Sequence, residues 1–277
     1  MDYQRAIIAI SGEDTEEFLQ GIITNDIKRL LEDDDEPSIY AAMLSPQGKF
    51  QHDFILISDG EKILIDHNAA ESETLLKRLK LYKLRADVTI ELHADWVLSL
   101  LPVDSEEGLE DPRHPELPNR HWGGERMEDA MSTDAYHAKR LALGVPEGGF
   151  DITEKETALD AGIDMLNGVS FTKGCYVGQE VTARMHYKGI ARKGFARIEG
   201  SAPLPEGAQE VTSNEKTVAD LRSQLGSHAL VFGRLDTIYP VIEAGGACSL
   251  GEASVTLSTP AWQDEKIKAY LDAARAS

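Results

Sequence analysis

Cysteine is scarce in this sequence: the 277 residues include two, Cys175 and Cys248. Two thiols exclude a disulfide-rich scaffold, and they are too few to hold a four-thiolate iron–sulfur cluster within the chain. Their spacing matches no zinc-binding pattern, so the sequence predicts no metal site of its own. We expect both thiols to be reduced, and we interpret Cys248, in "GGACSLGE", as structural.

Basic residues are also in short supply. The chain has 28 Lys and Arg against 48 Asp and Glu, a formal net charge of −20. Nucleic acids are bound largely through Lys and Arg contacts to phosphates, so this balance argues against direct nucleic-acid binding.

Long apolar runs are missing as well. No stretch approaches the roughly 20 apolar residues of a membrane span. The N-terminal run in "MDYQRAIIAIS" is too short for the central region of a signal peptide. These absences predict a protein with no membrane association and a cytoplasmic location.

The remaining pattern is that of an ordinary globular chain, 42% hydrophobic and 27% charged, long enough for two or three domains. Before residue 193 the sequence predicts strands such as "RAIIAIS", "IYAAML" and "FQHDFILI", and helices at "GEDTEEFLQGII", "ETLLKRLKLYKL" and "DAYHAKRLALG". After it, "KGFARIEG", "QEVTS", "HALVFGRLDTIYP" and "EASVTLS" predict short strands of a small barrel or sandwich, and "PAWQDEKIKAYLDAARAS" predicts a closing helix. The fold class is therefore α+β, with a mixed region over residues 1–192 and a β-rich domain over residues 193–277.

One stretch, "SFTKGCYVGQEVTARMHYKGIARKGF", reverses the overall charge. The segment from Lys173 to Arg197 contains six basic residues and one acidic residue, Glu180. Its formal charge is therefore +5, and that of the rest of the chain is −25. Ligands that carry carboxylate or phosphate groups are the ones expected to bind such a cationic segment. A solvated surface that balances acids elsewhere is the alternative.

Cys175 lies inside this segment, between Gly174 and Tyr176. Lys173 and nearby N–H groups are able to stabilise a thiolate, which would act as a nucleophile or as a soft metal ligand. A small buried apolar side chain is the equally weighted alternative. Gly174 and Gly178 allow a sharp turn or a close approach to a ligand. Gln179 and Glu180 either begin a helix or brace the loop by hydrogen bonds.

The stretch "KGCYVGQE" resembles the K-G-C-[YF]-x-G-Q-E signature of the YgfZ family of folate-binding proteins, which are related to the aminomethyltransferase (T protein) of the glycine cleavage system. "FLQGIITNDI", "SPQGKFQHDFILI", "LKLYKLRADVTI" and "RLALGVPEGG" agree in order along the chain. The extended motif looks most like the branch that includes the mitochondrial iron–sulfur assembly factor. The resemblance covers about residues 5 to 200, and beyond them only the strand pattern agrees.

The resemblance implies three domains around a central folate channel, two of them intertwined within residues 1–192 and the third a small C-terminal barrel. It implies tetrahydrofolate, or a one-carbon derivative, as cofactor, and iron–sulfur assembly proteins or client enzymes as partners. The motif cysteine, here Cys175, would carry the activity with assistance from Lys173. The implied cofactor-binding residues are Asp160 and Tyr136 for the pterin, Arg184 for the anionic tail, and Asp53 and Asn25.

The sequence also departs from its relatives. The T protein has an acidic pair where "GKFQHDF" places His52 and Asp53, so half of that pair remains. The transferase mechanism then lacks one of the two acidic residues that would serve it as a general acid/base or electrostatic partner. We therefore predict a folate-dependent accessory protein of iron–sulfur cluster assembly or repair that acts through Cys175. A tetrahydrofolate-dependent aminomethyltransferase, and a tRNA-modification factor acting through an iron–sulfur enzyme, are the alternatives.

Overall fold

The computed structural model describes residues 4–32, 37–93, 95–188, 191–263 and 267. The N-terminal part is built on a five-stranded antiparallel sheet with the order β2-β3-β4-β1-β5. Its strands are β1 (Arg5–Ser11), β2 (Ser38–Leu44), β3 (Phe50–Ser58), β4 (Ile63–Asn68) and β5 (Thr89–His93). The predicted strands in this region are confirmed.

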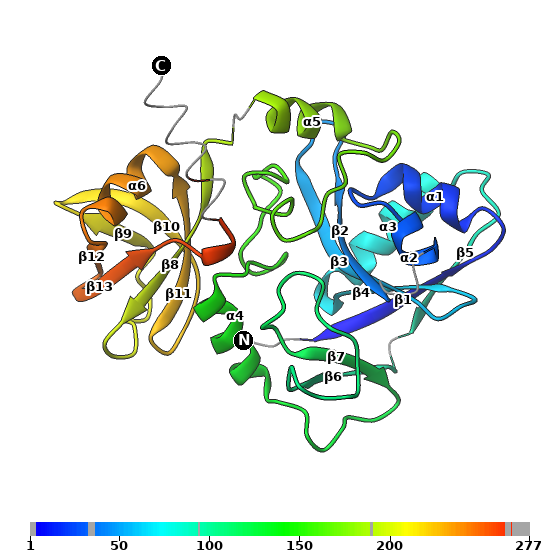
Figure 1. Ribbon diagram of the computed structural model, residues 1–277, viewed down its shortest axis with the longest axis horizontal. Coiled ribbons are helices and arrows are strands. Elements are labelled where there is room, and N and C mark those ends of the chain that lie inside the picture. The colour runs from blue at the N-terminus through cyan, green and yellow to red at the C-terminus, as the bar shows by residue number, and fades with distance from the viewer. Residues whose placement is uncertain (1–3, 33–36, 94, 189–190, 264–266, 268–277) are drawn as a thin grey trace.

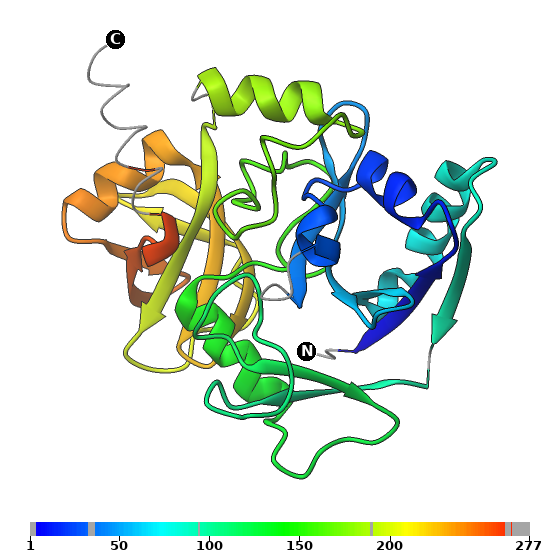
Figure 2. The same cartoon turned by 45° about the vertical axis from the view of Figure 1, so that its right-hand side comes forward.

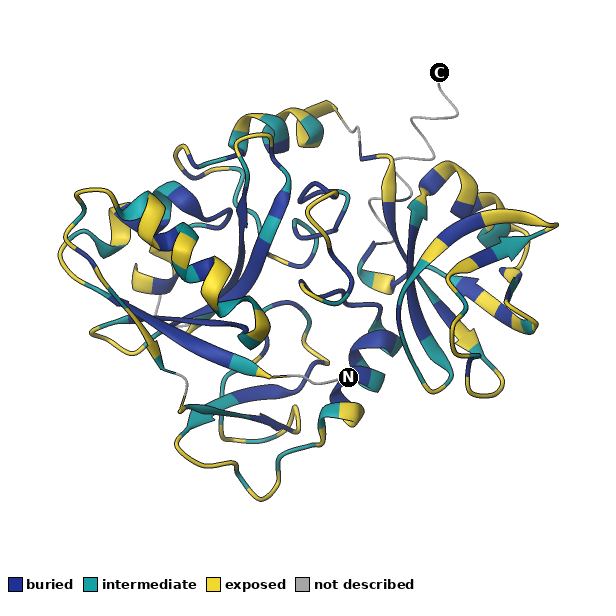
Figure 3. Cartoon of the chain, turned by 180° about the vertical axis from the view of Figure 1, so that it is seen from behind, coloured by how far each residue is buried: buried dark blue, intermediate teal, exposed yellow. Residues whose placement is uncertain are grey.

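Each face of this sheet supports its own core, because alternate residues of a strand point to opposite sides. One face, with Ile8, Ile10 and Phe54, packs against helices. These helices are α1 (Thr15–Ile22), α2 (Lys28–Glu32) and α3 (Ser72–Lys83), the last preceded by the short η1 (Ala69–Glu71). The other face, with Ile7 and Tyr40, is covered by the middle of the chain. Strands β1 to β4 are thus buried on both sides, whereas the edge strand β5 is largely exposed (Figure 3).

The middle of the chain contributes a hairpin, one helix and a long irregular region. The hairpin consists of β6 (Val97–Leu101) and β7 (Asn119–Gly123). The helix α4 (Thr133–Leu143) begins at Ser132, whose side chain accepts a hydrogen bond from the Ala135 N–H, and ends at Gly144 with a φ of 77°. Gly144 therefore supplies the left-handed C-cap of α4. Residues 145–178 contain no long helix or strand and lead into α5 (Gln179–Lys188).

The C-terminal part is a closed barrel with the strand order β10-β11-β8-β13-β12-β9. Its strands are β8 (Lys193–Gly200), β9 (Glu210–Ser213), β10 (Lys216–Leu225), β11 (His228–Arg234), β12 (Ala247–Leu250) and β13 (Ala253–Ser258), with α6 (Leu235–Glu243) between β11 and β12 and η2 (Ala261–Gln263) after β13. The α+β class and the C-terminal barrel are confirmed. The division of the chain at residue 192 stays a prediction.

One strand prediction is wrong in its second half. "HALVFGRLDTIYP" was expected to be β-like throughout, but β11 ends at Arg234 and α6 follows at once. Leu235, Ile238 and Tyr239 recur at helical spacing and are buried, so amphipathic packing decides the conformation. The predicted closing helix lies mostly outside the described residues.

The barrel and the five-stranded sheet lie at opposite sides of the molecule, with the β6–β7 hairpin below and α5 above (Figure 1). A chain of buried ion pairs runs through the segments between them. We name it the arginine–carboxylate chain, and its members in order are Arg5, Asp66, Arg120, Asp111, Arg113, Glu147, Arg140 and Asp151. The Ser223 hydroxyl of β10 donates to Asp151 and so connects this chain to the barrel.

The arginines of the arginine–carboxylate chain keep Asp66 and Asp111 ionised. Burial alone would raise the pKa of Asp66, but Arg120 and Arg5 outweigh it and hold the pKa below its ordinary value. Burial opposes ionisation of Asp111 in the same way, and Arg113 and Arg120 lower its pKa. These two carboxylates therefore depend on their arginines for a charged, buried state. Among the described residues no helix is long and apolar enough to cross a membrane.

We predict that Arg120→Leu destabilises the protein by about 3–5 kcal/mol, because it leaves Asp66 and Asp111 buried with fewer counter-charges. Chemical denaturation would measure the change in the free energy of unfolding. Arg85→Leu removes the same charge from an exposed site and is the matched control, expected to fall within about 0.5 kcal/mol of the wild type. Equal stability of the two variants would contradict the importance of the arginine–carboxylate chain.

Candidate functional site

The "KGCYVGQE" stretch forms a loop that lies along residues 21–25 of the N-terminal part. The Thr24 hydroxyl donates to the Gly168 carbonyl (2.6 Å), and the Ser170 N–H donates to the Thr24 carbonyl (3.0 Å). At the far end, the Val177 N–H donates to the Gly21 carbonyl (3.1 Å). We name residues 170–178 the motif loop. Figure 2 shows α5, which follows this loop, spanning the top of the molecule between the sheet and the barrel.

Lys173 anchors the middle of the motif loop. Its buried ammonium donates to the carbonyls of Ile23 (2.9 Å) and Asn25 (2.6 Å), and it lies 5.1 Å from the ring centroid of Tyr176. Burial lowers the pKa of Lys173 from 10.5 to about 8, against a smaller opposing effect of Asp26. The described contacts of Lys173 are structural, and its assistance to the Cys175 thiolate stays a prediction.

Tyr176 packs inward from the motif loop against the core. Its side chain is buried, and burial raises the pKa of its hydroxyl to about 12, against a smaller effect of the Thr182 side chain. Tyr176 is therefore a neutral packing residue of the loop.

Cys175 is exposed and unpaired, whereas Cys248 is buried. Burial raises the pKa of the Cys248 thiol to about 11, which makes it inert. The structural interpretation of Cys248 therefore fits its place in the barrel. The buried alternative for Cys175 does not fit, because its thiol faces solvent.

The two motif glycines differ in what the fold requires of them. Gly178 has a φ of 86°, and an added Cβ would lie 2.7 Å from the Ser45 carbonyl oxygen. Glycine is thus required for the motif loop to approach the turn after β2. A Cβ on Gly174 would meet no atom within 4 Å, so the protein's own packing does not require glycine there.

Helix α5 begins directly at the motif, as one of the two alternatives for Gln179 and Glu180 predicts. The Gln179 amide also donates to the Gly174 carbonyl (3.3 Å) and so braces the loop. Glu180 pairs instead with Arg184 one turn later (2.9 Å) on the exposed face of the helix. Arg184 is therefore placed on the outer surface.

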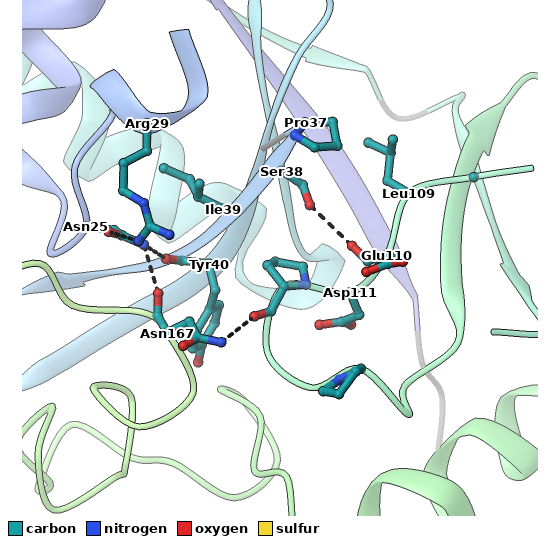
Figure 4. A pocket seen from close by; sticks show the side chains of 13 residues that line it. Asn25, Arg29, Pro37, Ser38, Ile39, Tyr40, Leu109, Glu110, Asp111 and Asn167 are labelled. Carbon is teal, nitrogen blue, oxygen red and sulfur yellow. Dashed lines mark hydrogen bonds between the residues drawn. The ribbon is translucent and has the colours of Figure 1, made fainter. Parts of the chain in front are cut away.

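A cavity of about 620 Å³ adjoins the segment that holds the motif loop. This volume falls in the range of small-molecule sites. Asn25 lines it and donates to the carbonyls of Tyr40 (2.8 Å) and Asn167 (2.8 Å), while Asn167 donates to the carbonyl of Pro112 (3.0 Å) (Figure 4). The cavity thus lies between β2 and the irregular segment 108–115, and it shares Asn25 with the Lys173 anchor.

Charged side chains of opposite sign line this cavity. Arg29 and Glu110 are exposed and lie on opposite sides of it (Figure 4). The sequence interpretation missed both of them, together with Asn167. The available signal was the irregular, proline-containing character of residues 104–126, since such loops often carry binding residues.

Three of the five predicted cofactor residues are connected around Tyr40. Asn25 donates to its carbonyl, and the Tyr40 hydroxyl donates to the Asp53 carboxylate (2.8 Å). Burial raises the pKa of Asp53, and Arg5 opposes this effect. Tyr136 joins them through Arg113, whose guanidinium lies 5.8 Å from the centroid of the Tyr40 ring and donates to the Tyr136 hydroxyl (2.9 Å). That hydroxyl in turn donates to Glu147 (2.6 Å). Of these three, Asn25 alone lines the cavity.

The other two predicted cofactor residues lie elsewhere. Asp160 accepts hydrogen bonds from the Thr157 hydroxyl (2.9 Å) and from the Lys193 N–H (3.4 Å), so it lies where the barrel begins. Arg184 lies on α5. Their folate-binding roles stay predictions, as do those of the three residues around Tyr40. Within the described ranges no group of three or more His, Cys, Asp and Glu residues is arranged to hold a metal ion.

Comparison with protein families gives a match in the barrel. A family model described as "CAF17, C-terminal beta-barrel domain" matches residues 192–265. In the solved structures, the crystal structure of glycine cleavage system aminomethyltransferase T from Bartonella henselae aligns over 92% of this chain and 83% of that chain, with a TM-score of 0.65 and 14% sequence identity. The predicted T-protein-like fold is therefore confirmed.

Curated relatives are similar over most of the chain. The iron–sulfur cluster assembly factor IBA57, mitochondrial, of Mus musculus is 30% identical in an alignment of 274 positions, and this alignment covers 84% of this chain and 76% of the mouse protein. The human protein of that name is 30% identical, with 82% and 74% covered. The homolog of Neurospora crassa is 31% identical, with 72% of this chain and 54% of the fungal protein covered. The chain thus spans about half the length of this fungal relative.

The expectation of a cytoplasmic location is wrong on this comparison, because these relatives are named as mitochondrial proteins. The expectation rested on acidity and on missing apolar runs. Those properties describe solubility and membrane insertion, and they carry no information on the compartment.

We predict that Lys173→Met loosens the motif loop, because the carbonyls of Ile23 and Asn25 lose a charged donor. An unsatisfied buried carbonyl costs about 1–3 kcal/mol. Hydrogen exchange of the amides of residues 170–178 should become faster in the variant. Lys188→Met, on the exposed end of α5, is the matched control and should leave that exchange unchanged. Unchanged exchange in Lys173→Met would exclude the anchoring role.

Proposed function

This chain belongs to the IBA57 family of iron–sulfur cluster assembly factors, and from that membership we propose that it is an accessory protein of iron–sulfur cluster assembly that acts through the thiol of Cys175 and binds a tetrahydrofolate. The observation that carries the proposal is the contrast within the motif loop. The Cys175 thiol is exposed, while Lys173, Tyr176 and Gly178 on either side are buried.

The exposed thiol suits a transient contact with a cluster or its components. A thiolate is the ligand that iron–sulfur clusters use in proteins. Cys175 supplies one such ligand, and no ligand group of three or more surrounds it in the described part of the chain. The remaining ligands of an iron–sulfur cargo would therefore come from the partner that carries it. A fixed loop reduces the entropy cost of presenting the thiol to that partner.

The donor set of the 620 Å³ cavity fits a reduced folate. The aminopyrimidine part of a pterin offers N–H donors, for which the Glu110 carboxylate is a charged acceptor. The glutamate tail carries carboxylates, for which Arg29 on the opposite side is a suitable cation. Pro37, Ile39 and Leu109 supply apolar wall between the two. Bound there, tetrahydrofolate would supply a one-carbon carrier beside the segment that anchors the motif loop.

The aminomethyltransferase alternative rests on the fold alone. In this chain His52 replaces the first acid of the T-protein pair, and it bonds Glu71 (3.1 Å). The Asp53 carboxylate already accepts hydrogen bonds from the Tyr40 hydroxyl and from the Gly148 N–H (3.3 Å). No described contact favours transfer chemistry over the accessory role.

We predict that Cys175→Ser fails to restore the activity of iron–sulfur enzymes in cells depleted of their own IBA57-type factor, while the wild-type chain restores it. A hydroxyl is a poor ligand for a cluster that takes thiolates, so the loss should be nearly complete. Cys248→Ala is the matched control, and it should retain function because this thiol is buried in the barrel. Full rescue by Cys175→Ser would show that the Cys175 thiol is not required and would contradict the proposal.

We predict that tetrahydrofolate binds saturably to the wild-type chain under reducing conditions, and that Glu110→Gln and Arg29→Gln each weaken it about tenfold, the loss of one charged contact. Calorimetric titration measures both. Glu128→Gln, exposed and away from the cavity, is the control for charge. Binding that survives both substitutions but is lost in Asp160→Ala would move the folate site to the start of the barrel. No binding to the wild type would end the folate proposal.

A further inference from the structure

A second cavity, of about 550 Å³, lies between the barrel and the loop that follows Ile152. Its walls come from Thr153, Lys155 and Glu156, from the start of β8, and from the facing parts of β10 and β11. It shares no lining residue with the 620 Å³ cavity. Nothing in the proposed function uses it.

Cationic groups converge on this second cavity from separate segments. Lys155 and Lys193 line it, are exposed, and have no side-chain hydrogen bond or ion pair with another described residue. Arg222, on β10, lines it too, and its Nε is buried without a hydrogen-bond partner among those residues. In a chain of net charge −20, such a gathering of incompletely paired cations at one cavity favours an anionic guest.

The acids of the second cavity do not cancel these cations. Glu156 accepts from Arg222 (2.9 Å) through one oxygen and from the N–H and hydroxyl of Thr153 through the other (2.7 and 2.6 Å). Both of its oxygens are thus occupied. Asp220 is the other acid in the lining, so the ammonium groups of Lys155 and Lys193 stay in excess.

An apolar wall completes the second cavity. Val218, Leu221 and Phe232 line it, and the Arg222 guanidinium lies 4.9 Å from the centroid of the Phe232 ring. The ring holds the guanidinium by a cation–π contact. A volume of about 550 Å³ also exceeds what an inorganic anion needs, so the guest has an organic part.

We propose that the second cavity binds a small organic phosphate, with its phosphate on Lys155, Lys193 and Arg222 and its organic part against the apolar wall. A terminal amino group of Arg222 is held by Glu156, which disfavours bidentate recognition of a planar carboxylate. Two compact ammonium groups and a single guanidinium N–H suit the three oxygens of a tetrahedral dianion.

The experiment is a calorimetric titration of phenyl phosphate and of inorganic phosphate into the full chain at constant ionic strength. The wild type should bind phenyl phosphate saturably and more tightly than inorganic phosphate, because the phenyl ring contacts the apolar wall. The double variant Lys155→Ala/Lys193→Ala should weaken phenyl phosphate at least about tenfold. Both lysines are exposed, so the variant keeps its fold.

Lys77→Ala/Lys80→Ala, on α3, is the matched control, since it removes the same charge from exposed positions outside the cavity. It should bind phenyl phosphate within about twofold of the wild type. An equal loss in both double variants would reduce the effect to net charge and overturn the site. Absence of saturable binding to the wild type, or undiminished binding to Lys155→Ala/Lys193→Ala, would overturn it as well.

Discussion

The fold depends on the neutralisation of buried carboxylates by buried arginines. Asp66 belongs to β4, Asp111 and Arg113 to the irregular segment after the hairpin's first strand, and Arg140 to α4. Removing such charges from water costs several kcal/mol per ion, and attraction offsets this cost only when every partner is in place. The arginine–carboxylate chain therefore fixes segments that have little regular secondary structure. It does so from the N-terminal sheet to Ser223 of the barrel.

This neutralisation decides which groups remain for ligands. Asp111 lines the 620 Å³ cavity, but Arg113 and Arg120 already hold its carboxylate. Tyr136 lies between Arg113 and Glu147 and is fully buried, so the ring that the resemblance assigns to the pterin is part of this framework. The charged groups that are accessible to a ligand lie at the cavity walls, where Glu110 and Lys155 are exposed. Cavity-lining charges, rather than buried ones, therefore carry both ligand proposals.

The sequence predicts local features of this structure better than distant pairings. The strands around "FQHDFILI" and the cap at Gly144 follow from period and turn chemistry, and the structure has both. The pairing of Arg120 with Asp66, 54 residues apart, has no local signal, because it depends on how the hairpin docks on the sheet. The same limit explains the missed cavity, whose walls join residue 29 to residues 110 and 167. The start of α6 was missed because "HALVFGRLDTIYP" was interpreted as one β-like run, whereas the buried faces of Leu235 and Ile238 stabilise a helix.

The motif itself shows why residue type alone does not assign a role. Lys173 and Cys175 are two positions apart and were expected to act together, as a cation that stabilises a thiolate. The fold separates their surroundings: the lysine turns inward to two carbonyls, and the cysteine turns outward to solvent. Gly178 lets the backbone continue into α5 without a clash against Ser45. The lysine then holds the loop in place, and the thiol stays accessible to solvent. Under the proposed function, such a loop would offer a single soft ligand in a fixed place, which suits a protein that passes an iron–sulfur cargo on rather than one that keeps it.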